Sequence, residues 1–365
     1  MRLLYITNGI NGSGGLERVL SIKASMLADR YGYEVHILVL NQPGKKNFFP
    51  FSSAIQIHHI KASGNPLSYY RQYKNGLKSV VQEVQPDIIS VCDDGFKGFM
   101  VPAIISHNCP VIYERHASVL IDAGQGTLSR LKNNVMYRLM QVRSRSFDKF
   151  VILTEGNRKE WTGPNVTVIP NPIAGFPDRM AELTAPNVIA VGSQSYNKGY
   201  DRLLEAWQMA AAAYPNWQLD IYGKKNPEMQ LEAVADRLGL SSSVTFHEPV
   251  ADIEQQYLNA SVMVLPSRSE GFGMVLIEAM ACGVPCVSFD CPHGPRDIIT
   301  DGADGFLVPD GDIAAFAAKV KLLMSDAPLR KAMGQKAVAT AHKYAPEQIV
   351  ARWDQLFRDL RSKTN

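Results

Sequence analysis

The sequence VLPSRSEGFGMVLIEAMACGVP, residues 264–285, decides the fold more clearly than any other stretch of the chain. We expect a strand that ends at Pro266, a loop that carries Gly271 and Gly273, and a helix over residues 272–281. The short apolar run at 286–289 predicts the next strand. A strand, a loop, a helix and a second strand form the unit from which parallel sheets with crossover helices are built.

The same alternation continues outward along the whole chain, with helix-period segments between short apolar runs. Strands are predicted at 3–7, 34–40, 55–60, 87–92, 111–113 and 150–153, and, after the breaker Pro170-Asn171-Pro172, at 188–191, 219–222, 244–246, 262–265 and 286–289. The sequence therefore predicts an α/β fold of two Rossmann-like, doubly wound domains, 1–172 and 173–345, that face each other across a cleft. The C-terminal segment, 346–365, has apolar residues at helical spacing and is expected to cross back to the first domain.

The composition fits this layout. With 365 residues, 46% of them hydrophobic and 20% charged, the chain can bury a core in each of two domains. No apolar run approaches the roughly 18 to 20 residues that span a bilayer, and residues 3–6 are too short for a signal peptide core, so we expect a cytoplasmic protein. Residues 1–172 carry 20 Lys and Arg against 12 Asp and Glu, and the remainder carries 18 against 23. The basic first half could meet phosphate groups or an anionic membrane, or could simply be solvated.

A glycine-rich loop, NGINGSGG at residues 8–15, follows the first predicted strand and precedes a predicted helix at 16–30. The amides and dipole of such a helix start favour an anion, which suggests a phosphate cradle. A dinucleotide-binding fingerprint is not matched, because Glu17 stands where its last glycine should be and Asn41 and Gln42 stand where its ribose-binding acid should be. The alternative is a tight turn that needs small residues.

Two acids in the opening stretch, Glu270 and Glu278, are separated by seven residues. On one helix this spacing would put both carboxylates on the same side, about two turns apart, where they could touch one extended ligand. Each carboxylate can accept hydroxyl hydrogen bonds of charge-assisted strength, which suits a polyol. The alternative is a pair of surface acids.

This stretch resembles the signature of two glutamates seven residues apart in the retaining glycosyltransferases of family 4, which have the GT-B fold. The resemblance spans nearly the whole chain. It implies that Glu270 lies by the transferred sugar, that Glu278 binds the ribose of the donor, and that Lys198 neutralises the leaving pyrophosphate. The catalytic set that it implies is Glu270, His116 and Lys198. The donor-binding set is Gly14, Gly15, Ser193, Lys198, Arg268, Gly271, Phe272, Gly273, Met274 and Glu278.

The chain departs from the family at Ser193, where many relatives have arginine. Arg268 is the candidate replacement cation, although a salt bridge at a helix end explains it equally well. His116 resembles the family histidine that faces the transferred sugar, whereas a lone histidine is more often structural. Glu114 and Arg115 beside it could line the pocket or pair with other groups.

The segment 290–309 resembles the family's closing segment, and its form is similar to relatives that use UDP-hexoses or UDP-N-acetylhexosamines in building surface polysaccharides, teichoic polymers or lipid-linked oligosaccharides. The resemblance thus implies transfer of a hexose or N-acetylhexosamine from a nucleotide sugar, with UDP expected, to a glycan or lipid-linked acceptor. Two other classes stay open. One is a sugar-nucleotide epimerase of the same architecture, and the other is a non-catalytic sugar-nucleotide-binding partner.

We expect neither a metal nor a cofactor. No Asp-x-Asp motif lies in a plausible loop, since Asp93-Asp94-Gly95 ends a strand. A cation and backbone amides would then meet the charge of the leaving group. Cys282, Cys286 and Cys291 lack zinc-ligand spacing and are expected to be buried. Retention is implied by the family, and without an evident nucleophile it indicates a front-face displacement.

Residues 130–149 predict a basic amphipathic helix, with Arg and Lys interleaved with aliphatic residues. We interpret it as a contact with an anionic membrane, at the inner face of the cell membrane. The alternative is a packed helix with a wet basic face. Aromatic residues are not interleaved with this stretch, so nucleic-acid binding is not expected.

Overall fold

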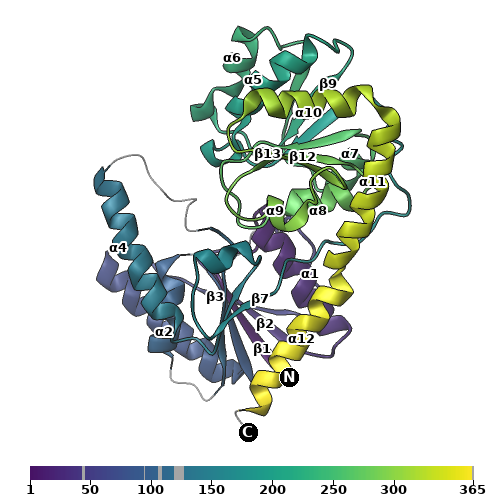
Figure 1. Cartoon of the computed structure of the whole chain (residues 1–365). Coiled ribbons are helices and arrows are strands. Elements are labelled where there is room, and N and C mark those ends of the chain that lie inside the picture. Colours follow the sequence, from purple (N-terminus) through teal and green to yellow (C-terminus); the bar gives the residue numbers. More distant parts are fainter. Residues whose placement is uncertain (43–45, 94, 106–108, 119–126, 364–365) are drawn as a thin grey trace. The chain divides into compact units, whose positions relative to one another are not determined.

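The computed structural model describes residues 1–42, 46–93, 95–105, 109–118 and 127–363, the side chains of 127–132 excepted. The chain divides into two compact units, one formed by Met1–Pro172 with Pro346–Asn365 and the other by Ile173–Ala345. Each unit is a parallel sheet flanked by helices (Figure 1). The predicted pair of Rossmann-like sheets is confirmed.

The first unit contains a seven-stranded sheet in the order β3-β2-β1-β4-β5-β6-β7. Its strands are β1 (Arg2–Thr7), β2 (Glu34–Leu40), β3 (Gln56–Ile60), β4 (Ile88–Cys92), β5 (Val111–Glu114), β6 (Lys149–Ile152) and β7 (Val166–Val168). Its helices are α1 (Gly15–Asp29), α2 (Pro66–Val84), α3 (Val101–Ile104), α4 (Thr127–Ser144) and α12 (Pro346–Ser362). The last strand, β7, was not predicted, because three residues are too short to give a periodic pattern.

Alternation along β1 places its side chains in two cores, one on each face of the sheet. Leu4 and Ile6 belong to one core, and Leu3 and Tyr5 belong to the other. The second core is completed by α12, whose Trp353 is buried there. This packing confirms the prediction that the C-terminal helix joins the first unit.

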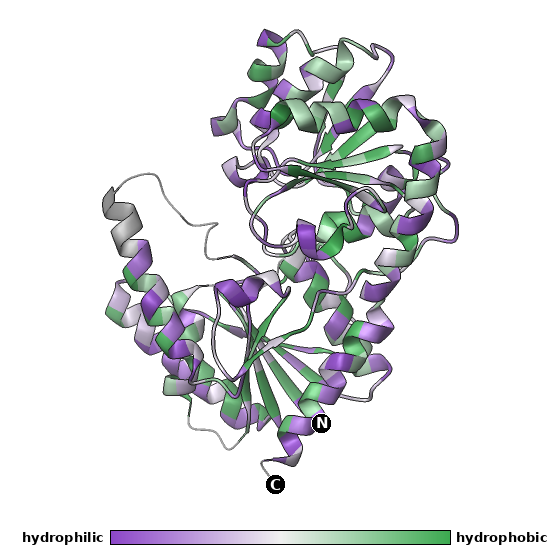
Figure 2. Ribbon diagram, viewed as in Figure 1, coloured by the Kyte–Doolittle hydropathy of each residue, from purple (hydrophilic) through white to green (hydrophobic). Residues whose placement is uncertain are grey.

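The second unit contains a six-stranded sheet in the order β10-β9-β8-β11-β12-β13. Its strands are β8 (Asn187–Val191), β9 (Gln218–Tyr222), β10 (Val244–His247), β11 (Val262–Leu265), β12 (Cys286–Asp290) and β13 (Gly305–Pro309). Its helices are α5 (Tyr200–Ala211), α6 (Leu231–Arg237), α7 (Ile253–Leu258), α8 (Met274–Ala281), α9 (Pro295–Ile298), α10 (Ile313–Ser325) and α11 (Ala327–Ala341). Figure 2 shows that hydrophobic residues prevail in the central strands of each sheet and in α8. The strand β13 was not predicted.

One boundary in the opening stretch differs from the prediction. Helix α8 begins at Met274 rather than at Phe272, with Gly273 as its N-cap. Glu270 therefore lies in the loop before the helix, while Glu278 lies within it. The argument that both acids occupy one helical face was wrong for this reason.

Strand order places particular loops at the functional edge of each sheet. In a doubly wound sheet, ligands bind beyond the carboxyl ends of the two strands between which the order reverses. These strands are β1 and β4 in the first unit and β8 and β11 in the second. The loop after β8 carries Lys198, and the loop after β11 carries Glu270. Within the described residues, the helices fall short of the length and apolarity needed to cross a bilayer.

Candidate functional site

Lys198 and Glu270 meet at the switch point of the second sheet. The Lys198 Nζ atom lies 2.7 Å from Glu270 Oε1, and Ser267 Oγ donates to the same oxygen at 2.6 Å. The Glu270 side chain is 8% exposed and the Lys198 side chain 24%. A carboxylate so enclosed needs these partners, because an unpaired buried charge is costly.

The turn that carries Lys198 packs closely against the residue that follows β11, Pro266. Gly199 follows the turn η4 (Tyr196–Lys198) with φ at +66°, and a Cβ atom there would lie 2.1 Å from the carbonyl oxygen of Pro266. Only glycine fits this approach without a shift of the backbone. The close contact is what brings the lysine loop to the glutamate loop.

The charge of Glu270 acts on its surroundings. Burial raises the pKa of the Tyr200 hydroxyl, and the negative charge of Glu270 raises it further. Burial and then Glu270 likewise raise the pKa of the Cys291 thiol. Both groups therefore stay protonated at neutral pH and add no charge beside Glu270.

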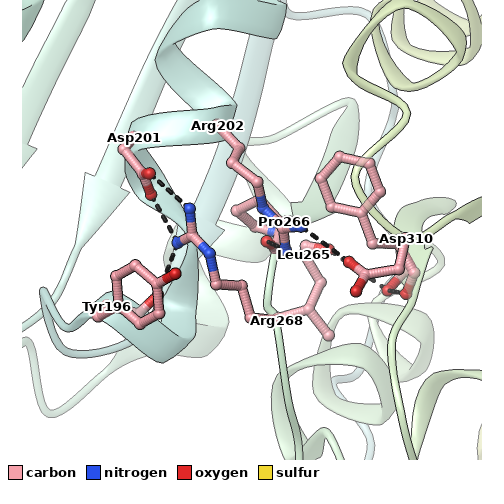
Figure 3. A network of polar contacts seen from close by, with 9 residues as sticks. Tyr196, Asp201, Arg202, Leu265, Pro266, Arg268 and Asp310 are labelled. Carbon is pink, nitrogen blue, oxygen red and sulfur yellow. Dashed lines mark hydrogen bonds and ion pairs between the residues drawn. The ribbon is translucent and has the colours of Figure 1, made fainter. Parts of the chain in front are cut away.

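Arg268 belongs to a polar network beside the lysine turn (Figure 3). Its guanidinium donates to both carboxylate oxygens of Asp201, at 2.8 and 2.6 Å, and to the carbonyl oxygen of Tyr196 at 2.7 Å. It also lies 4.1 Å from the centroid of the Tyr196 ring. Asp201 is in the first turn of α5, so Arg268 forms the helix-end salt bridge that the sequence left open. Arg202, close by, donates to Pro266 and Asp310.

Gly271, Phe272 and Gly273 connect Glu270 to Met274, the first residue of α8, and all four residues are buried. The carbonyl oxygen of Phe272 lies 2.3 Å from the place a Cβ atom would take on Gly294, whose φ is +86°. The loop before α8 thus packs closely on the closing segment 290–309. Ser193 is exposed, just after β8.

Glu278 lies in the second turn of α8 and is 9% exposed. The Tyr257 hydroxyl lies 3.4 Å from Glu278 Oε2, which is a long hydrogen bond. The cysteines Cys282, Cys286 and Cys291 are buried free thiols, which confirms the expected burial.

In the first unit, Gly14 is the N-cap of α1 and Gly15 is the first residue of the helix. Because glycine has no side chain, Gly14 gives the helix no side-chain capping hydrogen bond. Glu17 lies over this loop, with Oε2 2.6 Å from the position of a Cβ atom on Gly14. Asn8, after β1, donates to Asp93, after β4, at 2.7 Å. The glycine loop is therefore anchored at the switch point of its own sheet.

His116 follows β5 in the first unit, and its Nε2 atom lies 3.3 Å from Glu114 Oε2. Glu114 also pairs with Lys23, and Ser90 Oγ donates to its other oxygen at 2.5 Å. Burial alone would raise the pKa of Glu114, but the positive charge of Lys23 and the hydrogen bond from His116 outweigh it and lower the pKa to about 2. Glu114 is thus an ionised carboxylate at neutral pH.

Among the side chains that the structure describes, Cys92, Glu114 and His116 have a spacing that could hold a metal ion, with ligand atoms within 4.8 Å of one another. The ammonium of Lys23 pairs with the same Glu114 oxygen that faces His116. A metal ion there would have to displace a buried cation, so this group fits a proton-bearing network better than a metal centre.

The structure thus brings Lys198, Glu270 and Arg268 together, with Gly271 to Met274 adjoining them, while Gly14, Gly15 and His116 belong to the first unit. Sequence reasoning missed Ser267, although its place three residues before Glu270 was a usable signal. It also missed Tyr257 and Lys23, which are distant in sequence from their partners and carry no motif.

Two family comparisons cover most of the chain. Residues 13–174 match the family described as Glycosyltransferase Family 4, and residues 178–340 match the one described as Glycosyl transferases group 1. An uncharacterized glycosyltransferase of Haemophilus influenzae is 31% identical over 96% of this chain and 97% of its own length. The amylovoran biosynthesis glycosyltransferase AmsD of Erwinia amylovora is 27% identical over 97% of this chain and 99% of its own.

Among solved structures, HepE of Anabaena in complex with UDP and glucose superposes with a TM-score of 0.78 at 19% identity, over 98% of this chain and 99% of that one. The same protein has been solved with UDP-glucose. At this identity the likeness shows the fold, which is GT-B. The matched families, the full-length relative and the two doubly wound sheets together show that the chain belongs to glycosyltransferase family 4.

Proposed function

We propose that the chain is a retaining glycosyltransferase that moves a hexose or N-acetylhexosamine from a UDP-sugar to a glycan or lipid-linked acceptor, in the assembly of cell-surface polysaccharide or glycoconjugate. The observation that carries the proposal is the Lys198–Glu270 pair at the switch point of the second sheet. The amylovoran relative and the HepE complexes with UDP and UDP-glucose support the class of product and donor.

In this proposal each charged group has a separate task. Glu270 accepts hydroxyl hydrogen bonds from the transferred sugar, and Glu278 accepts those of the donor ribose. Lys198 turns toward the diphosphate as negative charge develops on it, with amides of residues 271–274 assisting. Gly14 and Gly15 approach the diphosphate and His116 faces the sugar. Ser193 is small enough to leave room beside the phosphates.

The chemical step is a front-face displacement. The acceptor oxygen bonds to the anomeric carbon on the face from which UDP departs, the bond from that carbon to the phosphate oxygen breaks, and the acceptor proton passes to the leaving phosphate. Lys198 supplies the positive charge, so we propose that no metal is required. Full activity after treatment with EDTA is expected, and loss that Mg²⁺ restores would contradict it. A glycosyl adduct trapped on Glu270 would overturn the front-face step.

A thermal-shift screen of nucleoside diphosphates and their sugars tests the donor. A ligand at 100 times its dissociation constant adds about 2.7 kcal/mol to stability, which is readily seen. We expect stabilisation by UDP and UDP-sugars but not by ADP or GDP, and its loss in Lys198→Met. Lys331→Met, which removes an exposed lysine on α11, is the matched control. Equal shifts with all three nucleotides would reject the UDP assignment.

The two other classes are separated by turnover. Incubation with UDP-sugar alone would form an epimer if the protein were an epimerase, whereas a transferase releases UDP and does so faster with acceptor. Binding of UDP-sugar without any release of UDP, across a panel of glycan and lipid-linked acceptors, would favour a non-catalytic partner.

A membrane contact is proposed for residues 130–149. On the described part of α4, Val135, Leu139 and Val142 are exposed by 52%, 47% and 68%. The exposed Arg138 and Arg143 lie beside them. Aliphatic side chains flanked by arginines suit the interface of an anionic bilayer. Arg130 and Lys132 lie outside the described side chains.

Flotation with liposomes that contain anionic lipid tests this contact. Charge reversal of Arg138, Arg143 and Arg145 should abolish binding. Reversal of the exposed Arg237, Lys331 and Lys336 in the second unit changes net charge equally and should not. Unaltered flotation of the first variant would reject the contact, and with it the location at the inner face of the membrane.

A further inference from the structure

Glu114 is the centre of a buried network in the first unit that the proposed reaction does not use directly. Its side chain is 1% exposed at the end of β5. One oxygen accepts from Ser90, while the other faces both Lys23 and His116. Ser90 and Lys23 are 24 and 91 residues from Glu114 in sequence, in β4 and α1. The arrangement is therefore built by the tertiary fold.

Lys23 is the unusual member, because a lysine is rarely buried without a strong reason. Its side chain is 1% exposed, in α1. Its Nζ atom lies 3.9 Å from the centroid of the Trp353 ring and 5.0 Å from that of Tyr5. Two aromatic faces and one carboxylate together offset the cost of removing the ammonium from water. Trp353 belongs to α12, so the C-terminal helix supplies one of the groups that surround the Lys23 ammonium.

We propose that Glu114 is a positioning residue for His116, and that Lys23, seated against Trp353, holds Glu114 ionised and fixed for that purpose. The carboxylate accepts the Nε2–H bond, so the neutral imidazole carries its proton on Nε2 and presents Nδ1 as its acceptor. Second partners of this kind fix both the tautomer and the orientation of a histidine ring. The inference rests on the proposed place of His116 beside the transferred sugar.

The decisive readout is the tautomer of His116, measured by two-bond ¹H–¹⁵N correlation spectra of the full chain labelled with ¹⁵N-histidine. His116→Gln identifies the signal. We expect the Nε2–H form in the wild type and loss of that preference in Glu114→Gln. Glu34→Gln removes a carboxylate 3.2 Å from His36 in the same unit and serves as the matched control. An unchanged His116 signal in Glu114→Gln would overturn the proposal.

A second variant guards against misfolding. Glu114→Gln alone leaves Lys23 buried without its counter-charge, whereas Lys23→Met/Glu114→Gln removes both charges and is expected to fold. In the double variant the Nε2–H preference should also be lost. We expect kcat to fall about 10- to 100-fold with donor KM nearly unchanged, as when an orienting carboxylate is removed from other histidines. A wild-type tautomer in this folded variant would overturn the proposal, and so would a wild-type kcat if His116→Gln itself lowers kcat.

The part played by Lys23 has its own test. Among the residues that the structure describes, Ser90 and Cys92 of β4 and Tyr5 of β1 also face Glu114, beside Lys23 and His116. Without the ammonium, Glu114 should protonate at a higher pH, so Lys23→Met should lose activity on acidification earlier than the wild type does. An identical acidic limb in both proteins would exclude this role.

The network and the function can fail separately. If the tautomer responds as expected but His116→Gln keeps wild-type kcat, positioning by Glu114 is supported and the sugar-facing role of His116 is contradicted. If His116→Gln is inactive but the tautomer does not respond, the function stands and the positioning proposal fails.

Discussion

Replacing Arg268 with glutamine tests whether its guanidinium stabilises the turn that carries Lys198 or binds the donor diphosphate. In the structure it makes two hydrogen bonds to Asp201 and one to Tyr196, and it covers the Tyr196 ring. The Asp201 side chain is 38% exposed, so solvent screening limits the ion pair to about 1 kcal/mol. The ring contact adds about 0.5 to 1 kcal/mol. We therefore expect Arg268→Gln to destabilise the second unit by about 1.5 to 2 kcal/mol.

For a unit of this size, about 1 kcal/mol corresponds to roughly 2–4 °C in Tm, so Arg268→Gln should lower the Tm by about 3 to 8 °C. Asp201→Asn completes a double-mutant cycle, and we expect a coupling energy of about 1 kcal/mol. Affinity for UDP, measured by titration calorimetry, should change by no more than about threefold, since the proposed phosphate cation is Lys198.

The reasoning would be refuted by a different pair of results. If Arg268→Gln weakened UDP binding by more than about tenfold, and Asp201→Asn strengthened it, the guanidinium would be competing between Asp201 and the diphosphate. Arg268 would then be the second cation that replaces the family arginine at Ser193. A coupling energy near zero would by itself contradict the proposal that Arg268 stabilises the lysine turn through Asp201.

Three further outcomes are expected. Gly294→Ala should cost clearly more stability than Gly302→Ala, because both positions have positive φ but only the first places a Cβ atom 2.3 Å from a backbone oxygen; equal shifts in Tm would contradict the close packing on Phe272. Ser267→Ala should lower kcat about tenfold with little change in the Kd of UDP, since it removes one charge-assisted hydrogen bond to Glu270; calorimetry and initial rates separate the two effects. Because the folded pKa of Glu114 is lowered from 4.5 to about 2, its contribution of about 3 kcal/mol is present above pH 4.5 and is lost as the pH falls toward 2. Melting temperatures of the wild type should therefore fall more steeply below pH 4.5 than those of Lys23→Met/Glu114→Gln. Parallel curves of Tm against pH would contradict this contribution of Glu114.

Most of the fold could be predicted because the strands bear strong local signals. In β1 and β4 nearly every residue is buried, so the apolar runs are continuous and bounded by polar or glycine-bearing loops. Short elements lack that signal, which is why β7 was missed. The start of α8 was placed two residues early, because hydrophobicity continues from Phe272 into the helix and does not reveal the left-handed backbone of Gly273.

The candidate site was predictable only where a motif lies within one loop. Glu270, Glu278 and the intervening glycines form a contiguous pattern, and Lys198 is carried by a recognisable loop of its own. The partners that hold them come from elsewhere: Asp201 is 67 residues from Arg268, and Glu114 is 91 residues from Lys23. Such pairings depend on strand order and helix packing, which no local pattern encodes.

Because α12 completes a core that begins at β1, the first unit is interrupted in sequence by the whole of the second. A ribosome releases Leu3 and Lys23 long before it releases Trp353. Until then one face of the first sheet is covered by α1 but not by α12, and Lys23 lacks its contact with the Trp353 ring. The second unit is one continuous segment, so it needs no later part of the chain and can fold while the chain is still growing. Helix α12 therefore acts as the closing step in the cotranslational folding of the first unit, and a nascent chain stalled before residue 346 should hold a folded second unit and an incomplete first unit.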